Sequence, residues 1–148
     1  MTRVLAIDAG STHTAFVVWD GLVAHAKGFM PNCEFLSLLK SGDLSPYDEI
    51  AFEMIACYGM PVGKEVFDTC VWIGRFSERC KGPQRMIYRK EVKMYLCGTM
   101  RAKDANVRQA LIDRIGAIGT KKQQGPLYGF KSHLWAALAV AEYAINNS

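Results

Sequence analysis

Stretches of apolar and β-branched residues alternate along the chain with segments of helical periodicity. The apolar stretches predict strands at 3–8, 13–19, 22–28, 49–54 and 84–88. Helical spacing and turn signals predict helices at 32–40, 62–80, 89–97, 104–115 and 132–146. Three strands in succession, followed by strands that alternate with helices, indicate an α/β fold with a mixed sheet, antiparallel first and parallel afterwards, flanked by helices.

Turn and cap residues support these boundaries. Asp20-Gly21 is a strong hairpin signal, and Gly82-Pro83 ends the long helix. Asn32 and Asp104 are expected helix N-caps. Residues 116–129 contain four glycines, two lysines and a proline, and are expected to form a loop.

Length and composition limit the class of protein. The 148 residues, 50% hydrophobic and 22% charged, suit a single globular domain over 1–148 with no internal repeat. No apolar stretch approaches the length of a membrane span, so no membrane association is expected. The first residues do not resemble a signal peptide, and a cytoplasmic location is therefore expected.

The five cysteines show no metal-binding or disulfide pattern. Their number is odd and no CxxC or Cys/His spacing occurs, so buried free thiols are the better expectation.

Charge is unevenly distributed. Residues 1–80 hold six Lys/Arg against ten Asp/Glu, whereas residues 81–122 hold eleven against three. An acidic portion and a basic portion in one fold suit a protein that brings metal to an anionic polymer, although a solvated basic face explains the charge alone equally well.

Two acids stand at expected strand ends. Asp8 ends the first strand, and Glu53 follows the apolar residues 50–52 of the fourth. Ligands of open α/β sheets bind at the carboxyl ends of strands, where hard oxygen ligands select Mg²⁺ or Mn²⁺. Taken alone, Asp8 is better explained as a cap of its own turn, but the two acids together favour a metal site.

A third candidate lies at the start of the last helix. His133 would face Asp8 if that helix packs beside the first strand, although a lone histidine at this position is more often a surface residue. Lys131 lies at the same helix N-terminus, where backbone N–H groups favour phosphate.

Four segments together resemble the RuvC family of Holliday junction resolvases, in particular its compact phage-type members. They are IDAGSTHTAFVVWD at 7–20, AFEM at 51–54 with VFDTCVWIGRF at 66–76, MRAKDANVRQAL at 100–111 and SHLWAALAVA at 132–141. Their order and spacing are similar to those of the family over nearly the whole chain.

The resemblance implies an RNase H-like (retroviral-integrase-like) fold, a homodimer, and Mg²⁺-dependent cleavage of branched DNA. It makes Asp8, Glu53 and His133 both the catalytic and the metal-binding residues, with Mn²⁺ as an alternative ion. A further acid of the family aligns with Ala136, which leaves two carboxylates and one imidazole. The mechanism would then be metal-activated hydrolysis of a phosphodiester, which needs no separate protein base.

On this interpretation the basic stretch contacts DNA phosphates, with recognition by shape rather than by base sequence. The expected DNA-binding residues are Arg85, Arg89, Lys90, Lys93, Arg101, Lys103, Arg108, Lys121, Lys122 and Lys131. The helix at 62–80, with Phe67, Trp72 and Phe76, is either the dimer surface or part of the core.

Three alternatives remain open. IDAGST also begins actin-like and sugar-kinase folds, but those need two such domains around ATP. A YqgF-type RNA-processing nuclease shares the acid at the first strand end. The alanine at position 136 favours a third alternative, a junction-binding protein that leaves DNA uncut.

Overall fold

A computed structural model describes residues 1–147, which form one five-stranded sheet and five helices. The strands are β1 (Val4–Ala9), β2 (His13–Trp19), β3 (Ala24–Pro31), β4 (Glu49–Met54) and β5 (Gln84–Tyr88). The helices are α1 (Asn32–Ser41), α2 (Lys64–Arg79), α3 (Arg89–Cys97), α4 (Asp104–Ile115) and α5 (Leu134–Asn146).

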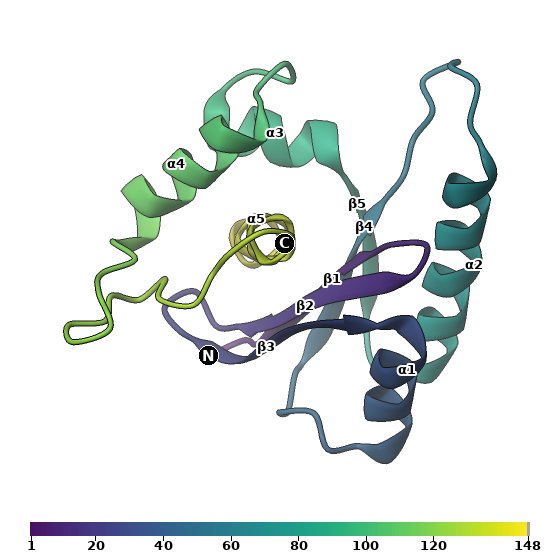
Figure 1. Cartoon of the computed structure of the whole chain (residues 1–148), viewed down its shortest axis with the longest axis horizontal. Coiled ribbons are helices and arrows are strands. Elements are labelled where there is room, and N and C mark those ends of the chain that lie inside the picture. Colours follow the sequence, from purple (N-terminus) through teal and green to yellow (C-terminus); the bar gives the residue numbers. More distant parts are fainter. Residues whose placement is uncertain (148) are drawn as a thin grey trace.

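The sheet has the order β3-β2-β1-β4-β5. Strands β1, β2 and β3 form an antiparallel meander, and β4 and β5 extend the sheet from β1 in parallel. Helices α1 and α2 cover one face, while α5 covers the other, with α3 and α4 beyond it (Figure 1). The predicted mixed α/β sheet is confirmed.

The alternation of side chains along the strands produces a separate core on each face. Val4 and Ala6 of β1 point toward α5, whereas Leu5 and Ile7 point toward α1 and α2. The core around α5 is larger because this helix is apolar on almost every side, with Leu138 fully buried. Burial on two faces explains why β1 is a continuous apolar run.

Strand β3 begins and ends later than predicted. The Asp20 carboxylate accepts hydrogen bonds from the backbone N–H groups of Leu22 and Val23, which holds both residues in the turn. At its far end β3 continues pairing with β2 as far as His13 opposite Pro31. The strand is therefore Ala24–Pro31 and not 22–28.

Two predicted N-caps and two predicted helix starts differ from the structure. Asn32 and Asp104 are the first helical residues, not N-caps, and Pro31 and Lys103 precede them as the flanking residues. Helix α2 begins at Lys64 and α5 at Leu134. Ser132 has a φ of 52°, a left-handed conformation that a helical residue cannot adopt, so His133 is the N-cap of α5 rather than part of its first turn.

Helix α2 contributes to the core and to the surface. Phe76 is fully buried against Phe35, with ring centroids 5.0 Å apart, so it is unavailable as a dimer contact. Phe67 and Val71, by contrast, are each 61% exposed.

All five cysteines are free thiols, as expected, but only Cys80 is buried, and Cys33 and Cys57 are exposed. Within residues 1–147 no helix is both long and apolar enough to cross a membrane.

Candidate functional site

Two carboxylates end neighbouring parallel strands on the face covered by α5. Ile7 of β1 pairs with Phe52 of β4, so Asp8 and Glu53 follow at the same level of the sheet. Both side chains point to the α5 side, because their strands alternate and Ala6 and Ala51 belong to that core. The two sequence candidates therefore lie side by side at the edge where α/β sheets bind ligands.

The turn after Asp8 is held by a buried polar network. The Thr14 hydroxyl donates to Asn32 Oδ1 at 2.6 Å, and the Asn32 amide donates to the Gly10 carbonyl at 3.0 Å. A Cβ at Gly10 would lie 2.6 Å from the His13 carbonyl oxygen, so this tight turn requires glycine. The network fixes the backbone that presents the Asp8 carboxylate.

Arg89, the first residue of α3, enters this acidic site. Its Nε donates to Glu53 Oε1 at 2.9 Å, and its Nη1 lies 3.7 Å from Asp104 Oδ1. The Glu53 side chain is only 14% exposed, whereas that of Asp104 is 86% exposed. Arg89 was predicted to contact DNA phosphate, and in this structure its partners are carboxylates.

The acid pair is electrostatically strained. Burial, followed by the nearby charge of Glu53, raises the pKa of Asp8 to about 7, although Arg89 opposes the shift. Burial also raises the pKa of Glu53, and the Arg89 guanidinium offsets that effect in part. Two largely shielded carboxylates share one guanidinium, so the site has a deficit of positive charge.

His133 lies next to the pair with its imidazole in an aromatic stack. Its ring is parallel to that of Phe29, with centroids 5.1 Å apart, and Phe29 also stacks with His13 at 5.3 Å. The left-handed backbone of Ser132 sets the direction from which His133 enters the site. The three rings come from β2, β3 and the N-terminus of α5.

Two cavities meet around Arg89 and His133. The smaller, of about 360 Å³, has Asp8 and the β1–β2 turn in its wall, together with the three stacked rings and Arg89. The larger, of about 520 Å³, is lined by both charged and apolar side chains. Its charged and polar lining is Glu53, Arg89, Lys93, Asp104, Arg108, Ser132 and His133.

The donor chemistry fits a hard divalent cation at the acid pair. Carboxylate oxygens with unmet negative charge, such as those of Asp8 and Glu53, are the ligands that Mg²⁺ and Mn²⁺ prefer. No group of three or more His, Cys, Asp or Glu side chains among residues 1–147 is close enough to hold a metal ion. The structure thus joins Asp8 and Glu53 and leaves His133 stacked beside them, while Ala136 lines the larger cavity.

Most of the predicted DNA-binding residues surround this opening or lie near it. Lys93 and Arg108 line the larger cavity, and the Lys90 ammonium lies 3.5 Å from the centre of the Tyr58 ring. Arg101, Lys103 and Lys131 are exposed next to α4 and α5. Arg85 is different, because its guanidinium donates to the Ala144 carbonyl near the opposite end of α5.

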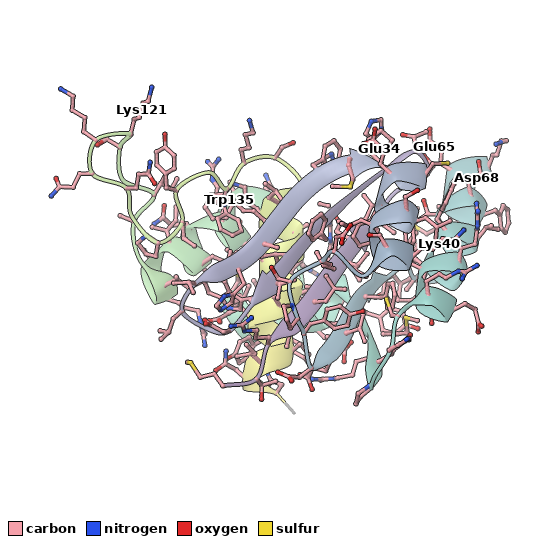
Figure 2. The ribbon with its side chains drawn as sticks, turned by 90° about the horizontal axis from the view of Figure 1, so that it is seen from below. Glu34, Lys40, Glu65, Asp68, Lys121 and Trp135 are labelled. Carbon is pink, nitrogen blue, oxygen red and sulfur yellow. The ribbon has the colours of Figure 1, made fainter. Side chains whose placement is uncertain are left out.

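Lys121 and Lys122 are carried by a small hairpin. Gly119 and Gln124 form its isolated bridge, and Gly119 adopts a left-handed φ of 77°. Figure 2 shows Lys121 at the tip of this loop, projecting from the body at the end away from α1 and α2. Residues 119–124 are called the basic hairpin below.

Three residues of the site were not identified from the sequence. Asp104 was interpreted as a cap, and nothing in its local pattern indicates Glu53 or Arg89 as neighbours. Phe29 and Tyr58 are exposed aromatics, and exposure cannot be read from a single sequence. Alternation along β3 is the one available signal for Phe29, since it separates the side chains on the two faces of the strand.

Comparison with solved structures gives the fold relationship. The chain is similar to "Thermus thermophilus RuvC structure", with 20% identity and a TM-score of 0.62, covering 97% of this chain and 95% of that one. It is also similar to "T. thermophilus RuvC in complex with Holliday junction substrate", with 16% identity and a TM-score of 0.71, covering 99% and 96%. No protein-family model and no curated protein sequence matches the chain. The chain therefore has a RuvC-like fold, and the RNase H-like sheet expected from the sequence is confirmed.

Proposed function

We propose that this chain, which shares its fold with Thermus thermophilus RuvC, is a metal-dependent endonuclease that cleaves branched DNA such as Holliday junctions. The observation that carries the proposal is the pairing of Asp8 and Glu53 at neighbouring strand ends beside a basic surface. One of the similar structures is described as a complex with a Holliday junction substrate, which supports the choice of DNA.

The residues divide into an acidic centre and a basic margin. Asp8 and Glu53 would hold divalent cations, with His133 as an additional ligand after its ring leaves the Phe29 stack. When bound, such cations supply an activated water and stabilise the charge that develops on the phosphate. Lys93 and Arg108, in the wall of the larger cavity, would bind phosphate oxygens and orient the strand.

The wider basic surface would follow the arms of the branched substrate. Helices α3 and α4 and the basic hairpin lie on the α5 side of the sheet (Figure 1), so their cations lie on the same side as the acidic centre. Contacts of this kind depend on the spacing of phosphates, and they select DNA shape more than sequence.

A homodimer would place two such centres on the two strands to be cut. Phe67 and Val71 of α2 are each 61% exposed, and removing such large apolar side chains from water would stabilise a contact. This exposure favours the outer face of α2 as the dimer contact. Helix α2 covers the face of the sheet away from α5, so the contact leaves the acidic centre open (Figure 1).

The test is a cleavage assay with labelled four-way junction, replication fork, linear duplex and structured RNA, each with Mg²⁺, Mn²⁺ or EDTA. Symmetric nicks confined to the junction, and absent with EDTA, are expected. Asp8→Asn should abolish the nicks and preserve binding, whereas the exposed Asp43→Asn, in the segment after α1, should cut normally. Cleavage of RNA alone would identify an RNA-processing nuclease instead.

A second candidate is a non-catalytic junction-binding protein. It is favoured by Ala136 in the cavity wall and by His133, whose ring stacks on Phe29 instead of contacting the acids. This alternative predicts equal junction binding with Mg²⁺ and with EDTA, and intact DNA in both.

A further inference from the structure

Arg89 occupies a position that its own helix does not favour. It is the first residue of α3, followed by Lys90, and positive charge at a helix N-terminus opposes the helix dipole by roughly 0.3–1 kcal/mol. The helix gains no cap from the guanidinium, whose contacts are the carboxylates of Glu53 and Asp104. The reason for a cation at position 89 therefore lies in the acidic site.

The guanidinium acts as the counter-cation of three carboxylates. It contacts Glu53 at 2.9 Å and Asp104 at 3.7 Å, and it shares the smaller cavity with Asp8. Burial alone would lower the pKa of Arg89, but the charges of Glu53, Asp104 and Asp8 outweigh burial and raise it. A divalent cation at the acid pair would compete with this guanidinium for the same carboxylate oxygens. It would also repel the guanidinium, because both are positively charged.

Arg89 also has room to leave the pair. Its side chain is 49% exposed, and it borders both the cavity of Asp8 and the cavity that contains Lys93 and Arg108. A guanidinium turned into the larger cavity would join Lys93 and Arg108, where Asp104 is the carboxylate that stays within its reach. A DNA phosphate bound there would supply the anion that replaces Glu53.

We propose that Arg89 is a positioning residue that holds the Asp8–Glu53 pair as its counter-cation, is displaced when a divalent cation binds, and then contacts a DNA phosphate. The inference rests on the proposed function and deepens it, since it makes phosphate contact at this site depend on metal occupancy.

The first test is calorimetric titration with Mg²⁺ at pH 8.5, without DNA. Arg89→Gln should bind Mg²⁺ about tenfold more tightly than the wild type, because the ion no longer displaces a cation. Arg89→Lys keeps the charge and should stay within about threefold of the wild type. Circular dichroism checks that both variants fold, and unchanged or weaker Mg²⁺ binding by folded Arg89→Gln overturns the inference.

The second test measures junction binding against salt concentration, in EDTA and in saturating Ca²⁺. Each phosphate contact contributes about 0.9 to the slope of log affinity against log salt. Arg89→Gln should leave the slope unchanged in EDTA and reduce it by about 0.9 in Ca²⁺. The matched control Lys122→Gln, on the basic hairpin away from the acids, should change the slope equally in both conditions.

The outcomes separate this inference from the proposed nuclease function. If the wild type cuts junctions while Arg89→Gln changes the slope equally with and without Ca²⁺, the nuclease proposal stands and the exchange of Arg89 is overturned. If the wild type binds Mg²⁺ and Arg89→Gln binds it more tightly, but no junction is cut, the nuclease proposal fails and the counter-cation role stands. A wild type that takes up no divalent cation overturns both.

Discussion

The imidazole of His133 lies parallel to the phenyl ring of Phe29, with ring centroids 5.1 Å apart and an angle of 9° between their planes. The contact joins the N-terminus of α5 to β3, two elements separated by most of the chain. It determines where the histidine at the start of α5 is held beside the acid pair. Helix position alone does not determine the direction of this side chain.

Removing the Phe29 ring should release His133. Phe29→Ala loses a stacking interaction worth about 0.5–1.5 kcal/mol, and because the ring is 49% exposed the loss of global stability should be below about 1 kcal/mol. The imidazole resonances of His133 should lose their ring-current shift in NMR spectra, and junction cleavage should not fall, because His133 no longer has to leave the stack before it acts as a ligand. Phe29→Tyr keeps the ring and should retain both properties, and unchanged His133 resonances in Phe29→Ala would contradict the stack.

Replacing Asp8 should stabilise the metal-free protein at neutral and alkaline pH. The folded pKa of Asp8, about 7, lies above its ordinary value of 3.8, so the wild type loses stability as pH rises through this interval. Asp8→Asn cannot ionise and avoids the loss, with a gain of up to a few kcal/mol at pH 8. Urea unfolding of both proteins in EDTA should give a difference that grows from pH 4 to pH 8. Mg²⁺ should stabilise the wild type more than the variant. A stability difference that does not change with pH would contradict the raised pKa of Asp8.

Substituting Gly10 should damage the turn that presents Asp8. A Cβ at this position meets the His13 carbonyl oxygen at 2.6 Å, so Gly10→Ala should cost about 1–3 kcal/mol in the free energy of unfolding. Gly74→Ala is the matched control, since its Cβ enters open space within α2 and should add up to about 1 kcal/mol. Urea unfolding measures both, and equal effects of the two variants would show that the turn tolerates a side chain.

Neutralising the basic hairpin should weaken DNA binding without changing the chemistry. The double variant Lys121→Gln/Lys122→Gln should reduce the slope of log affinity against log salt for junction binding by up to about 1.8, because it removes up to two phosphate contacts of about 0.9 each. Its cleavage rate at saturating protein should equal that of the wild type, because the hairpin lies outside the acidic centre. Lys40→Gln, on α1 at the other end of the molecule (Figure 2), should have no effect on the slope. A loss of slope from Lys40→Gln as large as that from the hairpin would place the DNA elsewhere.

A charge on the exposed face of α2 should prevent dimerisation. Phe67→Glu places a carboxylate where an apolar ring is 61% exposed, and it should convert a dimer to a monomer in sedimentation velocity. Leu22→Glu is the control, since that side chain is 63% exposed in the turn between β2 and β3. Dimers in both variants would exclude this face of α2 as the contact.

Local pattern determined most of the fold and the positions of the two acids. Strands β2, β4 and β5 and helices α3 and α4 have the predicted bounds, because apolar and β-branched stretches or basic helical segments between turn signals are visible in the sequence. Each acid lies at the end of an apolar stretch, so the sequence places both acids at strand ends, and the pairing of Ile7 with Phe52 in the structure sets them on one face.

Only the tertiary structure decided what surrounds those acids. The pairing of Arg89 with Glu53, the approach of Asp104, and the stacking of His133 on Phe29 each join elements distant in the sequence. Such contacts depend on how helices pack across a sheet, and neither periodicity nor propensity records that packing. Phe76 and Phe67 lie on one helix, and only the packing of α2 on the sheet buries the first and exposes the second. The sequence by itself determined where the charges lie along the chain, and the fold determined which of them are forced to share one site.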